Sequence, residues 1–240
     1  VTQDAETLGW DATETFLATA SDDGLVRVYE LVNNSLNFVT SIATGGAAID
    51  GVGQVAWHPT QSILALARES GSAQVWTFNF NGSTLTTISS IGLAAAGRAC
   101  AWHPSGDFLA VGSLVTGGEV RIYPVNSSGV INAAGVVTFN ITPNRTIQYE
   151  ALSWDKNGDY LAVGLLTDSV NPDLLILEVT FGPLAITGIN ASLTLGRSIG
   201  GLDWGKGPDF LAVGLFGTTG DNVQVYEHDD GGGGVGAGTL

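Results

Sequence analysis

The feature that most constrains this chain is an internal repeat anchored on tryptophan. Five Trp residues recur at spacings of 47, 45, 52 and 50 residues: Trp10, Trp57, Trp102, Trp154 and Trp204. Seven residues after each Trp comes a Leu-Ala pair, always preceded by a large apolar residue: Phe16, Ile63, Phe108, Tyr160 and Phe210. Self-similarity at this period predicts an array of like units, each of which buries its apolar face against a neighbour.

Each unit carries the pattern of four short β-strands. The first strand ends at the Trp, as in QVAW or ACAW, and a polar turn such as HPSGD follows it. A second run such as FLAVG ends in a small residue, a third such as VRIYPV alternates, and a Thr-rich fourth closes the unit. Short runs bounded by Gly, Pro, Asn and Asp indicate strands. Because no segment has apolar residues at helical spacing, we expect almost no helix.

Four strands in 45 to 50 residues, repeated along a chain, are typical of propeller blades. The string CAWHPSGDFLAVGSLVTGGEVRIYPV, residues 100–125, strongly resembles a WD-repeat blade. The chain departs from that family in lacking the Gly-His dipeptide, and the Trp of the Trp-Asp dipeptide survives only as Trp76. The resemblance implies a propeller that docks other proteins. Because the dipeptides are missing, we expect packing, rather than the family's Asp-His network, to hold the blades together.

The sequence therefore predicts a single all-β, five-bladed β-propeller of four-stranded antiparallel blades. The expected blades span about 1–45, 46–92, 93–145, 146–197 and 198–240. In each first strand the Trp lies on a bulky face, and the residue before it lies on the opposite, flatter face: Gly9, Ala56, Ala101, Ser153 and Asp203. Stacking bulky against flat faces predicts a ring of five blades closed by side-chain packing between the first and the last.

Charge limits the partners. The 240 residues contain 8 Lys and Arg against 23 Asp and Glu, a net charge of −15. A nucleic acid or an anionic membrane surface needs clustered cations, which this chain lacks, so neither is an expected partner. No apolar run reaches the 18 or so residues of a membrane span. The lone Cys100, flanked by Ala, cannot form an intrachain disulfide and is expected to be a small buried hydrophobe.

The chain starts at Val1 and contains no Met, which suggests a removed leader or an excised fragment. Six Asn-x-Ser/Thr sequons are candidate glycosylation sites of a secreted protein: Asn33, Asn81, Asn126, Asn140, Asn144 and Asn190. These sequons favour an extracellular or cell-surface location, with the cytoplasm as the alternative. The first three also fall in equivalent strand-connecting turns, which favour Asn and Ser in any case.

Candidate binding residues gather at one expected mouth of the central channel. Glu6, Arg98 and Glu150 share the position four before the Trp. Acidic residues in the connections between second and third strands emerge on the same face: Asp22, Asp23, Glu69, Glu119, Asp168, Asp173 and Asp221. This face is either a solvated acidic rim or a site for a cationic partner or divalent cation.

No catalytic, metal-binding or cofactor-binding constellation stands out. His58 and His103 lie in separate blades, whereas metal ligands must converge, so both are interpreted as turn residues. The run DKNGD, residues 155–159, is interpreted as a strand turn whose side chains bond its own backbone. Only Glu6 and Glu150 could form the carboxylate pair that a glycosidase needs.

Three functions remain open. The first is a non-catalytic extracellular structural or assembly protein, such as a filament or surface-layer subunit, with protein partners that include copies of itself. The second is an intracellular WD-repeat scaffold for protein interactions, and the third, less favoured, is a propeller glycosidase or lactonase. Self-association would run through the Gly-rich tail 231–240, added as a strand to a neighbouring molecule. The simpler alternative folds that tail onto its own fifth blade.

Overall fold

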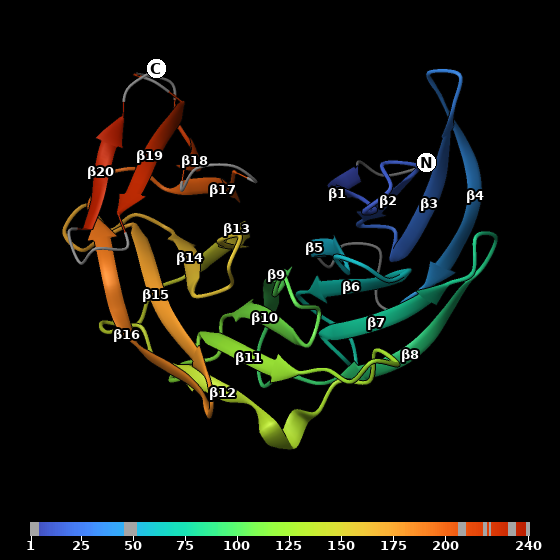
Figure 1. Ribbon diagram of the computed structural model, residues 1–240, viewed down its shortest axis with the longest axis horizontal. Helices are drawn as coiled ribbons and strands as arrows, with labels where there is room; N and C mark the ends of the chain where they lie inside the picture. Colours follow the sequence, from blue (N-terminus) through green and yellow to red (C-terminus); the bar gives the residue numbers. More distant parts are fainter. Residues whose placement is uncertain are drawn as a thin grey trace.

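The computed structural model describes residues 5–45, 52–205, 210–217, 220, 222–229 and 234–238. These residues form five separate four-stranded sheets, and within each sheet every strand pairs antiparallel with its neighbour in the chain (Figure 1). The one helix among them is a single 3₁₀ turn, η1 (Ala133–Gly135). The five-bladed all-β propeller fold is therefore confirmed, as is the near absence of helix over the described residues.

The strand bounds follow the repeat. Blade 1 contains β1 (Ala5–Trp10), β2 (Phe16–Ser21), β3 (Leu25–Val32) and β4 (Ser35–Ala43). Blade 2 contains β5 (Val52–Trp57), β6 (Ile63–Arg68), β7 (Val75–Phe80) and β8 (Leu85–Ile91). Blade 3 contains β9 (Gly97–Trp102), β10 (Phe108–Ser113), β11 (Val120–Pro124) and β12 (Val137–Phe139). Blade 4 contains β13 (Ile147–Trp154), β14 (Tyr160–Leu165), β15 (Leu174–Phe181) and β16 (Leu184–Leu193), and blade 5 contains β17 (Ile199–Trp204), β18 (Phe210–Leu215), β19 (Val223–Asp229) and β20 (Gly234–Gly238).

The first strand of each blade lies innermost and packs on the first strand of the next blade (Figure 1). In blades 2, 3 and 4 the Trp that ends this strand donates a hydrogen bond from its indole Nε1 to the carbonyl of the residue before the preceding blade's Trp, whereas Trp204 Nε1 in blade 5 is buried without a hydrogen bond. The pairs are Trp57 to Gly9 at 3.0 Å, Trp102 to Ala56 at 3.1 Å and Trp154 to Ala101 at 3.2 Å. The predicted stacking of bulky against flat faces is thus confirmed, with an added polar contact.

The blades form an open arc rather than a closed ring. Figure 1 shows a gap between blade 1, in blue, and blade 5, in red, on the two sides of which lie β1 and β17. Leu8 and Trp10 on blade 1 are exposed, and so are Phe210 and Val223 on blade 5. The expectation that side-chain packing between these two blades closes the ring is therefore wrong. The length of the chain matches five blades, but it does not determine the angle between neighbouring blades, and that angle decides whether the ring closes.

The Gly-rich tail completes its own blade. β20 pairs antiparallel with β19, and Tyr226 lies opposite Ala237. This is the predicted fourth strand, which the sequence placed at 233–240; residues 231–233, 239 and 240 lie outside the described residues. The backbone of this tail segment therefore pairs within its own chain, as in the simpler of the two arrangements drawn from the sequence, and self-association through the tail stays a prediction.

Candidate functional site

The position four before each Trp coincides with a β-bulge in every first strand. The strand register shifts at or around Glu6, Gly53, Arg98, Glu150 and Gly200. A bulge leaves one residue unpaired and turns its side chain away from the regular alternation. At Glu150 the backbone is left-handed, with φ of 53°. The three charged residues that the sequence placed at one mouth of the channel therefore all occupy bulges.

A compact polar cluster joins three blades at this mouth. Arg98 Nη2 lies 2.8 Å from Glu69 Oε1, and the guanidinium carbon lies 4.4 Å above the ring centre of Tyr149. The Tyr149 hydroxyl donates a hydrogen bond to the same Glu69 oxygen. Burial, followed by the contact with Glu69, raises the pKa of Tyr149 to about 12. The Tyr149 phenol therefore stays protonated at neutral pH, and its hydrogen bond holds the Glu69 carboxylate beside the Arg98 guanidinium.

Asp22 lies beside this cluster, close enough for its charge to contribute to the raised pKa of Tyr149. Its Oδ1 atom is buried and accepts no hydrogen bond, and Arg98 Nε is buried and donates none. Buried polar atoms normally have partners, so two such atoms in one cluster call for an explanation. An unbonded acceptor and an unbonded donor in this region are groups that the N–H and C=O of a bound peptide segment can satisfy.

A cavity of about 550 Å³ adjoins this mouth. Its wall includes Gln54 and Glu150 from the channel side, Gly200 and Phe216 from blade 5, and Leu8 from blade 1. The cavity therefore extends from the channel to the open side of the arc. Glu6, the third predicted member, is exposed on β1 next to Leu8.

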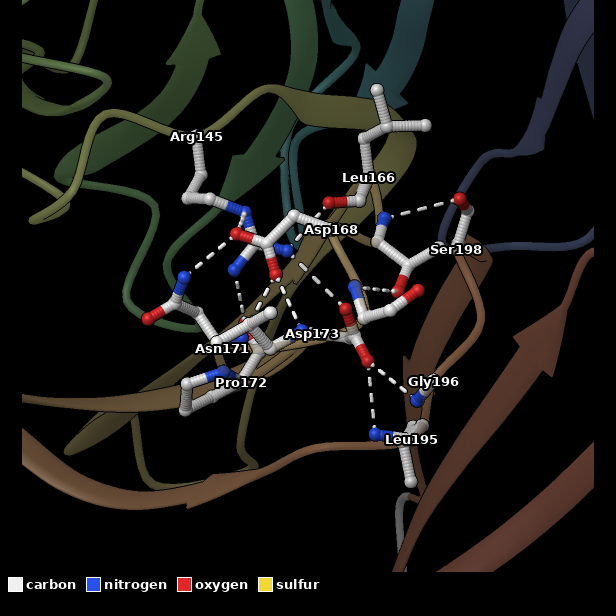
Figure 2. A network of polar contacts seen from close by, with 12 residues as sticks. Arg145, Leu166, Asp168, Asn171, Pro172, Asp173, Leu195, Gly196 and Ser198 are labelled. Carbon is white, nitrogen blue, oxygen red and sulfur yellow. Dashed lines mark hydrogen bonds and ion pairs between the residues drawn. The ribbon is translucent and has the colours of Figure 1, made fainter.

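Two of the predicted acidic residues hold the long loop between β14 and β15 instead of facing a ligand (Figure 2). Asp173 is fully buried and accepts hydrogen bonds from Arg145 Nη2 at 3.2 Å and from the backbone amides of Leu195 and Gly196 at 2.9 and 2.8 Å. Asp168 lies 3.4 Å from Arg145 Nε, and the Asn171 amide bonds hold its pKa at about 2. Both carboxylates are thus occupied within blade 4.

Glu119 has the same structural role in blade 3. It is buried, and its Oε2 atom accepts the backbone amide of Ile141 at 3.0 Å. In blade 2 the neutral Gln74 does the same for Leu93 at 2.6 Å. The residue just before the third strand therefore ties down the segment after the fourth strand, and an amide serves as well as a carboxylate. This repeated role removes Glu119 and Asp173 from the candidate site.

Of the other predicted binding residues, some are engaged elsewhere or lie outside the described residues, and the rest lie at the channel mouth. Asp23 forms an ion pair with Arg27, and this contact lowers the pKa of Asp23 to about 2. Asp221 lies outside the described residues. The structure thus brings together Asp22, Glu69 and Arg98, adds Tyr149, which the sequence analysis missed, and places Glu150 on the wall of the adjoining cavity. Tyr149 sits directly before the bulge residue Glu150, and an aromatic at that position is the signal that was available.

Two histidines also have a role that the sequence analysis missed. His58 and His103 bond their own turns, as expected, through Nδ1. Each also bonds through Nε2, at 3.2 Å, to a glycine carbonyl in the next blade, Gly106 and Gly158 respectively. A Cβ at Gly158 would lie 1.8 Å from His103 Nε2. The pattern of His in one turn and Gly in the same turn of the next blade was visible in the sequence.

The sequon asparagines, Cys100 and the turn 155–159 were also singled out in the sequence. Five sequon asparagines are exposed, and the sixth, Asn190, is half-buried with its Oδ1 3.0 Å from His228 Nε2. Cys100 is fully buried, as expected of a small hydrophobe, and burial raises the pKa of its thiol to about 12. In the DKNGD turn, Asp155 accepts the amides of Asn157 and Tyr160, as predicted. Exposure makes five of these asparagines accessible to glycosylation, and their glycosylation stays a prediction.

The described residues contain no group of three or more His, Cys, Asp or Glu side chains placed to hold a metal ion. Among them there is also no helix with the length and apolar character needed to cross a membrane.

Five radially arranged four-stranded sheets define the chain as a β-propeller. Residues 4–30 match the family model described as WD domain, G-beta repeat, and residues 55–142 match that of the Anaphase-promoting complex subunit 4 WD40 domain. The chain is a WD40-repeat β-propeller. WD40 propellers typically bind proteins and are usually non-catalytic scaffolds.

A curated relative shares a short stretch with the chain. It is the Ribosome biogenesis protein ERB1 of Malassezia globosa, 40% identical over 68 residues, which are 25% of this chain and 8% of that protein.

Solved structures share the fold at low identity. A chain in the Mitotic Checkpoint Complex matches 98% of this chain and 65% of its own length, with a TM-score of 0.71 and 18% identity. A functionally unknown protein from Desulfotomaculum acetoxidans matches 100% of this chain and 70% of its own, with a TM-score of 0.78 and 13% identity. Sqt1 from Chaetomium thermophilum matches 93% and 56%, with a TM-score of 0.64 and 20% identity. The chain therefore spans only part of the proteins that it resembles.

Proposed function

We propose that this chain is a protein-interaction scaffold that binds a basic peptide segment of its partner at the channel mouth. The observation that carries the proposal is the pair of buried, unbonded polar atoms there, Asp22 Oδ1 and Arg98 Nε. A lysine or arginine side chain, or a backbone amide, supplies the donor that Asp22 lacks. A backbone carbonyl supplies the acceptor for Arg98.

The charge of this chain favours a positively charged partner segment. The net charge of −15 attracts cations over a distance of several ångströms, which speeds association with a basic segment. Within the mouth, Arg98 is neutralised by Glu69. Asp22 and Glu150 add two carboxylates that the cluster does not use for that pairing. A basic segment therefore gains a favourable field, and an acidic one is repelled.

The comparisons support a scaffold over an extracellular structural subunit. Three of the matched proteins are described by a complex or an assembly process: the anaphase-promoting complex, the mitotic checkpoint complex and ribosome biogenesis. Each description belongs to that protein and not to this chain. They favour the second of the three functions drawn from the sequence, and the extracellular location remains a prediction.

The test is an array of immobilised 15-residue peptides, graded from acidic to basic, probed with the fluorescently labelled chain. We expect basic peptides to be retained, and retention to fall several-fold at 0.5 M salt because exposed charge pairs are screened. Asp22→Asn should reduce retention at least about fivefold, as expected for one charge-assisted hydrogen bond. The matched control is Glu14→Gln, which removes the same charge from the exposed turn between β1 and β2, at the other end of the blade. Equal retention of the two variants, or retention that ignores peptide charge, contradicts the proposal.

A further inference from the structure

One position of the repeat divides the surface around the channel mouth into two chemically different sides. The residue directly after the second strand is acidic in blades 1 and 2, at Asp22 and Glu69. In blades 3, 4 and 5 it is apolar: Leu114, Leu166 and Phe216. In these three blades its amide bonds, at 2.9 Å, to the carbonyl of the residue just before the first strand. The three apolar residues therefore occupy equivalent places beside the mouth.

The apolar side chains at this position are open to solvent. Leu166 is 45% exposed and Phe216 is 59% exposed, while Leu114 is half-buried. Val170, in the loop between β14 and β15, adds a fourth apolar side chain that is 79% exposed. We call these four residues the apolar rim. Single exposed apolar residues are ordinary, but several that gather at one end of neighbouring blades indicate an interaction surface.

The loop that carries Leu166 and Val170 is held in place without a partner. Arg145 donates hydrogen bonds to the carbonyls of Leu166 and Pro172 at 2.6 and 2.9 Å. Asp168 Oδ1 accepts the backbone amide of Val170 at 3.0 Å. Figure 2 shows the Leu166 side chain directed away from this network. Because the loop is already ordered, binding to it does not cost the entropy of fixing it.

Phe216 connects the apolar rim to the charged part of the mouth. Its ring lies over Gly200, where an added Cβ would meet ring atoms at 3.1 to 3.4 Å. Gly200 occupies the bulge position that carries Glu150 in blade 4. Phe216 and Glu150 also line the same cavity of about 550 Å³. A carboxylate and an aromatic ring in one cavity suit a basic side chain, because lysine and arginine carry apolar stems below their charge.

The acidic side and the apolar rim are close enough for one short segment to contact both. The Tyr149 hydroxyl of blade 4 donates to Glu69 of blade 2, so side chains of blades that are not neighbours meet at the mouth. Tyr149 lies on β13, and the residue before that strand, Thr146, accepts the amide of Leu166. A partner segment that lies over the mouth therefore needs few residues between its contact on Glu69 and its contact on Leu166.

We propose that the partner segment is amphipathic, a short stretch in which lysine or arginine lies a few residues from large apolar side chains such as Leu or Phe. This inference rests on the proposed function and adds a second requirement to it. The basic residues bind at Asp22, and the apolar residues cover Leu166, Val170 and Phe216. Charge steers the segment to the mouth, and burial of the apolar rim adds affinity that salt weakens little. A purely basic segment leaves the apolar rim in water.

The test measures, by fluorescence anisotropy, the affinity of the chain for three peptides of equal length. The first is basic and apolar, the second has Ser in place of its apolar residues, and the third has Gln in place of its basic residues. We expect the first to bind at least about tenfold tighter than the second, because it buries further apolar surface. Leu166→Ser should weaken binding of the first peptide about fivefold and leave the second unchanged, whereas Asp22→Asn should weaken both. The matched control is Val130→Ser, at a 42% exposed residue between β11 and β12, at the other end of its blade.

The outcomes separate this inference from the proposed function. If the first two peptides bind equally and the third binds weakly, the apolar requirement is wrong and the proposed function stands. If the first and third bind equally, charge plays no part and both are wrong. Val170→Ser is a second variant in case Leu166→Ser lowers the melting temperature, and unchanged binding of the first peptide by both variants overturns the inference. Binding to uncharged phosphatidylcholine vesicles that Leu166→Ser abolishes would assign the apolar rim to a lipid surface and also overturn it.

Discussion

The interface between blades 3 and 4 and the free face of blade 1 carry the same kinds of residue in different surroundings. Trp154 of blade 4 packs against blade 3 and donates its indole N–H to the carbonyl of Ala101. Beside it, His103 of blade 3 bonds to the carbonyl of Gly158 in blade 4. Trp10 occupies the same place in its own strand and is exposed. The difference teaches that a blade's sequence specifies which faces can be buried, while the presence of the neighbouring blade decides whether they are. Stability in this molecule is therefore a property of adjacent pairs of blades.

The largest expected effect separates the two kinds of Trp. Trp102→Ala should destabilise the chain by about 3–5 kcal/mol, because it removes a buried indole and leaves a cavity between blades 2 and 3. Trp10→Ala should cost less than about 1 kcal/mol, because its ring has no blade against it. Urea unfolding followed by circular dichroism measures both. Similar losses for the two variants would show that blade 1 is covered in solution.

Much of the fold was predictable because the repeat reports local structure directly. The Trp and Leu-Ala spacing fixed all five first and second strands, and the alternation predicted which face of each strand is flat. Closure was not predictable, because the angle between blades depends on side-chain packing across each interface. At the candidate site, the acidity of the loops did not separate Asp173, bonded to backbone amides, from Asp22, which is not. That distinction depends on where the chain returns after the fourth strand, which the sequence does not show.

A smaller effect is expected at the glycine beneath His103. Gly158→Ala should cost about 2–4 kcal/mol, since it adds left-handed strain at φ of 83° to a clash with the imidazole. The control is Gly82→Ala, where φ is 91° and nothing lies within 4 Å of the added Cβ. That variant bears the backbone strain alone, about 1–2 kcal/mol. If thermal unfolding gives the same loss for both, the histidine does not reach across the interface.

The smallest effect is a dependence on pH that belongs to the internal interfaces. Burial lowers the pKa of His58 and His103 below the ordinary value of about 6.5. Above that pH both rings are neutral in the native and unfolded chains. As the pH falls through it, the unfolded chain binds protons first, so the native state loses stability, by about 1 kcal/mol or less between pH 7 and 6.

The check is the difference in melting temperature between pH 7 and 6, measured for the parent chain and for His58→Gln with His103→Gln. We expect the double variant to be less stable at both values and to change less between them. A change as large as that of the parent would assign the effect to other groups.

Residue-resolved hydroxyl-radical footprinting of the 240-residue chain tests the central claim most directly. If the internal interfaces are packed and the two end faces are open, Leu8, Trp10 and Phe210 should be oxidised several-fold faster than Trp57, Trp102 and Trp154. Equal protection of Trp10 and the three internal tryptophans would mean that the five blades close on themselves, and it would contradict the account.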